Sequence, residues 1–69
     1  MKAFKCSSKD YGSCQANHYP PNKKAGDKEH CIELVGQGLS YPILTTSSQC
    51  RKLANWLLKV ADAIDKDIQ

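Results

Sequence analysis

The sequence lacks long apolar runs. No apolar stretch follows the opening residues Met1 to Lys5, so a secretory signal peptide is not expected, and no segment approaches the ~20 apolar residues of a membrane span. We therefore expect a soluble protein of the cytoplasm. In that compartment the four cysteines should be reduced, although the same even count in a secreted domain would indicate two disulfides.

Motifs that carry catalysis are also missing. The chain has no phosphate-binding glycine loop, no zinc-protease motif and no evident pair of catalytic carboxylates. His30 and Cys31 are neighbours on a predicted strand, so their side chains should point to opposite faces and cannot form a dyad. A chain of 69 residues leaves little room for a substrate cavity beside its core. We expect a protein that is not an enzyme and that needs no cofactor.

The cysteines are too widely spaced for an ordinary structural zinc site. Such sites usually contain a close pair such as C-x2-C, whereas the intervals here are C-x7-C-x3-H and H-C-x18-C. Buried free thiols, which behave as small apolar side chains, are the favoured interpretation. Zinc is the alternative, because a predicted hairpin carries three suitable ligands on one side and the covering helix carries a fourth. These four ligands are Cys6, Cys14, His18 and Cys50.

The net charge of +3 is mild but unevenly distributed. Residues 1–28 contain six lysines and two aspartates, whereas residues 29–69 contain four basic and five acidic side chains. With tyrosines interleaved, the basic half is an alternative nucleic-acid-binding surface. A plain solvated surface is the favoured interpretation, because specific binders show denser clustering. The candidate lysines are Lys5, Lys9, Lys23, Lys24 and Lys28.

Alternating polar and apolar residues predict strands within residues 2–44. Asp10–Gly12 and Gly36–Gly38 supply turn residues between them. Leu39–Leu44 is a candidate fourth strand at an edge of the sheet, since Pro42 in its middle is tolerated only there. The three clearer strands are Lys2–Ser8, Ser13–Tyr19 and Glu29–Val35.

The last third of the chain reads as one amphipathic helix over residues 46–66. Its start is marked by Thr46 and Gln49, which fit a capping box. Packed on the strands, this helix predicts a single α+β domain over residues 1–69, an antiparallel meander of three or four strands against one C-terminal helix. At about 100° per residue, one face of the helix gathers Cys50, Leu53, Ala54, Leu57, Val60, Ala61, Ile64 and Ile68.

This apolar stripe is wider than a single core needs. Trp56 and Leu58 fall on its two shoulders, and Trp is the residue most enriched at binding hot spots. We therefore expect the indole to lie beside water or another chain, where it would contact a different protein or a second copy. The alternative is that Trp56 merely covers the edge of the sheet, since a single exposed aromatic needs no explanation. The predicted partner-binding residues are Trp56, Leu58, Arg51, Lys52, Asn55 and Lys59.

The charges of the helix oppose its dipole, at roughly 0.3–1 kcal/mol each. Arg51 and Lys52 lie near the amino end, whereas three aspartates, Asp62, Asp65 and Asp67, crowd the carboxyl end. A solvated surface tolerates this arrangement. The alternative is a homodimer in which two helices pack antiparallel about a twofold axis, so that the basic end of each lies beside the acidic end of the other.

Residues 48–58, SQCRKLANWLL, and residues 61–65, ADAID, resemble the closing helix of many small, uncharacterised phage, prophage and plasmid proteins. That helix is of the type Q-x-R-x-L-A-x-x-L-x-x-A-A-D, and Val60–Ala61 stands where the double alanine is common. The cysteine-rich front of the chain departs from the pattern. The resemblance implies an accessory protein of a mobile element, acting in the host cytoplasm by binding and modulating or inhibiting a host or defence protein; an anti-CRISPR is one example.

Overall fold

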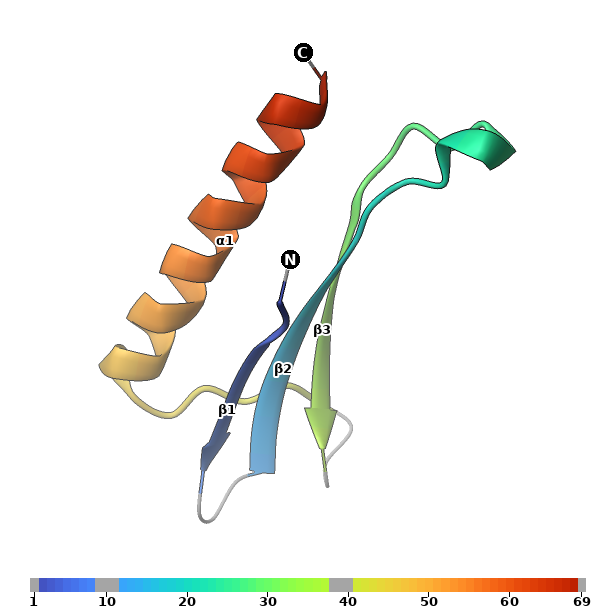
Figure 1. Cartoon of the computed structure of the whole chain (residues 1–69). Helices are drawn as coiled ribbons and strands as arrows, with labels where there is room; N and C mark the ends of the chain where they lie inside the picture. Colours follow the sequence, from blue (N-terminus) through green and yellow to red (C-terminus); the bar gives the residue numbers. More distant parts are fainter. Residues whose placement is uncertain (1, 9–11, 38–40, 69) are drawn as a thin grey trace.

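The computed structural model describes residues 2–8, 12–37 and 41–68, and it shows an α+β arrangement (Figure 1). Three antiparallel strands precede a single long helix, which confirms the predicted fold class. The elements are β1 (Phe4–Ser8), β2 (Gly12–Tyr19), the short 3-10 helix η1 (Lys23–Ala25), β3 (Cys31–Gln37) and α1 (Ser47–Ile68).

The sheet has the order β1-β2-β3, with β2 in the centre. Phe4 pairs with Ala16, and Ala16 pairs with Leu34, so these three side chains share the face that α1 covers. The opposite face is polar: Asn17 donates a hydrogen bond to Glu33 Oε1 at 3.0 Å, and the Tyr19 hydroxyl donates to the same oxygen at 3.0 Å. The alternation read from the sequence is thus reproduced on both faces.

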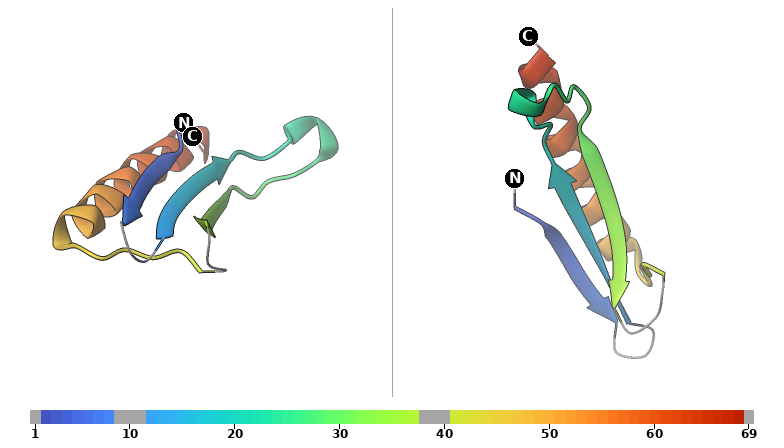
Figure 2. Two further views of the ribbon diagram at one scale, coloured as in Figure 1. Left: turned by 90° about the horizontal axis from the view of Figure 1, so that it is seen from below. Right: turned by 90° about the vertical axis from the view of Figure 1, so that its right-hand side faces the viewer.

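Helix α1 lies on one side of the sheet and runs beside β1, as the views in Figures 1 and 2 agree. Helix and sheet bury a small core between them, made of Phe4, Cys14, Ala16, Trp56 and Val60. Around it pack four partly buried side chains, Cys6, Leu44, Leu53 and Ile64. Because α1 sits toward β1, the apolar residues Ile32 and Leu34 of β3 stay exposed.

The rotation of α1 differs from the predicted one. Trp56 is 8% exposed, although it was expected beside water, and Leu57 is 41% exposed, although it was expected in the core. Of the predicted stripe, three side chains pack on the core as expected, but Cys50, Ala54 and Ala61 are exposed, and the side chain of Ile68 lies outside the described part. The indole decides the rotation, since its burial removes more apolar surface from water than burial of a leucine would.

The amino end of α1 is capped nearly as predicted. The amide of Gln49 donates to Thr46 Oγ1 at 3.1 Å, which confirms Thr46 as the cap. The Gln49 side chain reaches back to the amide of Thr45, at 2.8 Å, rather than to that of Thr46. Its Nε2 also donates to the carbonyl oxygen of Ser7 at 3.1 Å, so the same side chain ties the start of α1 to the end of β1.

The predicted turn at Gly36–Gly38 is wrong for its first two residues, which belong to β3; Gly38 lies outside the described residues. Gly36 is needed for a close approach instead. A Cβ atom there would overlap the backbone of Tyr41 and lie 2.9 Å from the nitrogen of Pro42. The connection to α1 crosses the sheet at this point, so residues 41–44 form no strand. Of the predicted fourth strand, Leu39 and Ser40 lie outside the described residues.

The rotation of α1 predicts opposite outcomes at two neighbouring positions. Trp56→Ala should lower the free energy of unfolding by about 3–5 kcal/mol, because it empties the largest volume in the core. Leu57→Ala should cost less than about 1.5 kcal/mol, because that side chain is already partly in water. Urea unfolding of dilute protein measures both, and a larger loss for Leu57→Ala would contradict the observed rotation.

Gly36→Ala should destabilise the fold by about 1–3 kcal/mol, since the added methyl group must displace the Tyr41–Pro42 backbone. Thermal unfolding followed by circular dichroism measures this change. An unchanged melting temperature would mean that the crossing segment does not touch β3 at Gly36.

Candidate binding site

A hollow opens between the free edge of β1 and one flank of α1. One wall is formed by three consecutive residues, Ala3, Phe4 and Lys5. Because successive side chains of a strand point to opposite faces, this wall is the edge of the strand and not one of its faces. The other wall comes from helix positions three and four residues apart, which share one side of a helix. We call this the β1–α1 hollow; it is lined by Ala3, Phe4, Lys5, Lys52, Asn55, Trp56 and Lys59.

The β1–α1 hollow is cationic. Three of its seven lining residues are lysines and none is acidic. Within the part of the chain that the structure describes, the ion pairs all involve Asp67, so Lys5, Lys52 and Lys59 keep their charge unneutralised. Phe4 and Trp56 supply an apolar floor between these charges. Such a hollow favours an extended ligand that carries negative charge.

Trp56 is held rigidly at the base of the hollow. Its Nε1 donates a hydrogen bond to the carbonyl oxygen of Lys2 at 2.8 Å, and its ring packs in the core. The expectation of an exposed indole is therefore wrong. A partner can contact only the small accessible part of the ring. The main role of Trp56 is structural, because its hydrogen bond links α1 to the residues before β1.

The six predicted partner-binding residues divide between two surfaces. Lys52, Asn55, Trp56 and Lys59 come together in the β1–α1 hollow. Arg51 and Leu58 do not: Leu58 is 65% exposed on the side of α1 that faces away from the sheet, and Arg51 donates to Ser47 Oγ at 3.3 Å. Sequence reasoning missed the strand half of the hollow, because nothing in the local pattern shows which strand edge the helix will border.

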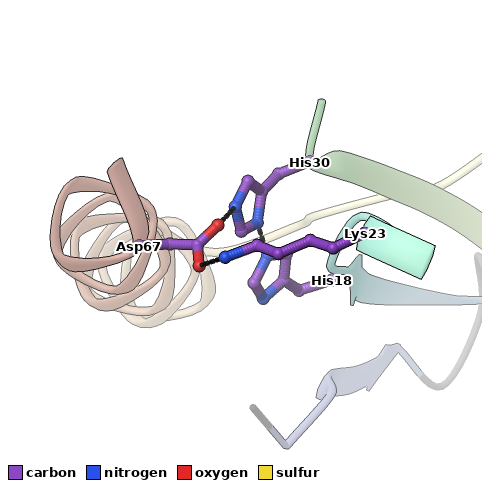
Figure 3. A network of polar contacts seen from close by, with 4 residues as sticks. All are labelled: His18, Lys23, His30 and Asp67. Atoms are coloured by element: carbon purple, nitrogen blue, oxygen red, sulfur yellow. Dashed lines mark hydrogen bonds and ion pairs between the residues drawn. The ribbon is translucent and has the colours of Figure 1, made fainter. Parts of the chain in front are cut away.

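A second polar cluster fastens the carboxyl end of α1 to the β2–β3 hairpin (Figure 3). Asp67 accepts a hydrogen bond from Lys23 Nζ at 2.6 Å and another from His30 Nε2 at 2.8 Å. His30 Nδ1 in turn lies 2.9 Å from His18 Nε2, and the two rings are stacked. We call these four residues the C-terminal latch. They explain why an aspartate stands where it opposes the helix dipole.

The hydrogen bond to Asp67 determines which ring nitrogen of His30 carries a hydrogen. A carboxylate can only accept, so His30 Nε2 carries a hydrogen, and a neutral His30 then accepts at Nδ1 from His18 Nε2. Burial, followed by the nearby His30, lowers the pKa of His18. The hydrogen bonds from Lys23 and His30 lower the pKa of Asp67. His18 Nδ1 is buried without a hydrogen-bond partner in the described part of the protein.

The four residues of the zinc alternative do not lie together. Cys6 and Cys14 face each other across β1 and β2, whereas His18 belongs to the latch and Cys50 is exposed on α1. All four cysteines are free thiols. Among the described residues no group of three or more potential ligands is placed to hold a metal ion, so the zinc alternative is not supported. Burial, and then the neighbouring Cys6 thiol, raises the pKa of Cys14, which keeps that thiol protonated.

The lysines proposed for nucleic-acid binding do not form one patch. Lys5 lines the β1–α1 hollow, whereas Lys23, Lys24 and Lys28 lie around η1 at the far end of the β2–β3 hairpin, and Lys23 is paired with Asp67. Lys9 lies outside the described residues. The lysines of the nucleic-acid alternative thus form two groups, one beside β1 and the other in the β2–β3 connection.

Comparison with protein-family models, with curated proteins and with solved structures finds no match for this chain. No helix in the described residues combines the length and apolarity that crossing a bilayer would need.

The latch makes stability depend on pH. The folded state binds the His18 proton less tightly than the unfolded state does, so stability is fully present above the ordinary pKa of 6.5 and is lost as the pH falls below it. The lowered pKa of Asp67 adds a further loss below its ordinary value of 3.8. The free energy of unfolding should therefore decrease between about pH 7 and pH 5.

His18→Gln is the matched control, since glutamine keeps a hydrogen-bond donor but does not titrate. Its stability should change less over the same pH interval in urea unfolding experiments. Equal losses in both proteins would show that the pH dependence arises elsewhere.

Proposed function

We propose that this protein is a non-catalytic protein-interaction module that holds an acidic segment of another protein in the β1–α1 hollow. One observation carries the proposal: four of the helix residues singled out from the sequence line one hollow together with an edge of β1 that no other described strand pairs with. Backbone groups at such an edge can bond an extended chain, and lysines beside it attract carboxylates.

The mixture of groups in the hollow favours a protein partner. The small accessible parts of Phe4 and Trp56 offer limited apolar contact, Asn55 can both donate and accept a hydrogen bond, and three lysines surround them. Nucleic acid would instead favour basic and aromatic residues spread along a continuous track, whereas the lysines of η1 lie in the β2–β3 connection and do not line the hollow.

The non-catalytic part of the proposal is supported by how the reactive side chains are used. The two imidazoles of the C-terminal latch are engaged with each other and with Asp67. Cys14, the most deeply buried thiol, keeps its proton. Neither group is arranged as a nucleophile next to a base.

The biological setting that we propose is that of a mobile-element accessory protein in the host cytoplasm, where it would occlude a host or defence protein. The resemblance of α1 to the closing helix of phage and plasmid proteins supports this setting. Occlusion requires only a surface that competes for a partner, which suits a chain of 69 residues with a small core.

An NMR titration with a glutamate-rich peptide of about twelve residues tests the function. We expect amide shifts confined to residues 3–5 and 52–59, and weaker binding as salt increases. Lys52→Glu together with Lys59→Glu should reduce affinity at least tenfold, because two attractions become repulsions.

The matched control is Lys24→Glu together with Lys28→Glu, which makes the same change in net charge in the β2–β3 connection, outside the hollow. It should leave peptide affinity within about twofold of the original, since screening weakens charges that far away. Equal losses in both double variants would overturn the assignment to the hollow. Tighter binding of a single-stranded oligonucleotide, lost in the control variant, would favour the nucleic-acid alternative.

A further inference from the structure

The flank of α1 opposite the β1–α1 hollow carries an apolar patch that the monomer leaves exposed. Ala54, Leu57, Leu58 and Ala61 are all exposed, and Leu58 is 65% exposed. In Figure 2, α1 packs against the sheet alone among the elements that the structure describes. We call these four residues the outer face. It is separate from the β1–α1 hollow, whose lysines lie on another flank of the same helix.

Opposite charges stand at the two ends of the outer face. Arg51 lies toward the amino end of α1, and Asp62 and Asp65 lie toward the carboxyl end. Arg51 and Asp65 are about 21 Å apart along the helix axis, given a rise of 1.5 Å per residue. In the described part of the chain, ion pairs form only at Asp67, so none of these three charges is neutralised by an ion pair.

We propose that the outer face binds a second copy of this chain, with the two α1 helices packed antiparallel about a twofold axis. The axis passes between Leu57 and Leu58. This places Ala54 level with Ala61 of the second copy and Leu57 level with its Leu58. Arg51 then lies beside the Ile64–Asp65 pair of the second copy, and the symmetry repeats the contact.

Charge complementarity identifies a second copy as the occupant. A helix that is basic at one end and acidic at the other repels a parallel copy and attracts an antiparallel one. The apolar residues occupy the middle of the outer face and the charges occupy its ends. Antiparallel pairing therefore buries the apolar residues and neutralises the charges at the same time. It also accounts for an apolar stripe wider than the monomer core requires.

Size favours the same conclusion. The buried core of the described residues consists of five side chains, and short chains hide a small fraction of their surface. Small alanines beside the leucines let two helices approach closely enough to pack. The dimer leaves both β1–α1 hollows open, so dimerisation and acidic-partner binding are independent.

Sedimentation equilibrium over micromolar to millimolar protein tests the proposal. We expect a mass of two chains at the higher concentrations. Leu58→Glu should weaken dimerisation at least tenfold, because it puts two carboxylates near the twofold axis. Tyr41→Glu is the matched control, since Tyr41 is 75% exposed but lies outside α1, and it should not change the dissociation constant.

Charge reversal decides the orientation. Arg51→Asp alone and Asp65→Arg alone should each weaken the dimer, whereas the two changes in one chain should restore it to within about threefold, because the pair is only exchanged. A protein that is monomeric at every concentration would overturn the proposal, as would a dimer that Leu58→Glu leaves intact. A double variant weaker than either single variant would overturn the antiparallel arrangement.

Discussion

The burial of Trp56 is the constraint on which the rest of this structure depends. Its ring fills the space between α1 and the strands, and its Nε1 bonds to the carbonyl oxygen of Lys2, fifty-four residues away in sequence. This one side chain sets the rotation of α1. Every surface assigned to the helix, whether the hollow, the outer face or the end that carries Asp67, follows from that rotation.

Two further ties hold the helix at its ends. Gln49 bonds to the carbonyl oxygen of Ser7 near the start of α1, and Asp67 bonds to Lys23 and His30 near its end. Polar contacts at both ends and an aromatic contact in the middle stabilise a helix that shares only a small apolar core with the sheet. The latch also gives a physical role to charges that intrinsic helix stability does not favour.

The fold was largely predictable from the sequence, because its signals are local. Alternation marked the three strands, and the threonine and glutamine at positions 46 and 49 marked the helix start. The rotation of α1 was not predictable from the distribution of apolar residues around the helix. That distribution counts how hydrophobic each side chain is, but it does not show which side chain fits the space above the sheet. Leucines outnumber the single tryptophan, yet the tryptophan occupies the core.

The sites were predictable only in part, for the same reason. Helix spacing brought Lys52, Asn55 and Lys59 together, but Lys5 joins them through a tertiary contact that no local pattern encodes. Likewise, the sequence predicts Gly36 as a turn residue, whereas in the structure it lies in β3 and allows the backbone of Tyr41 to pass close to the strand. The sequence suggests His18 only as a zinc ligand and His30 only as a neighbour of Cys31. The register pairs His18 with Ile32, two residues from His30, and the two imidazoles lie 2.9 Å apart.

Hydrogen exchange of the indole N–H, followed by NMR, tests the central claim most directly, because Trp56 is the one tryptophan of the chain and its signal is unambiguous. A buried N–H bonded to the Lys2 carbonyl should exchange slowly, with protection comparable to that of the backbone amides of β2. Exchange at the rate of a free indole would contradict the account, since α1 would then present Trp56 to water and turn its leucines toward the sheet.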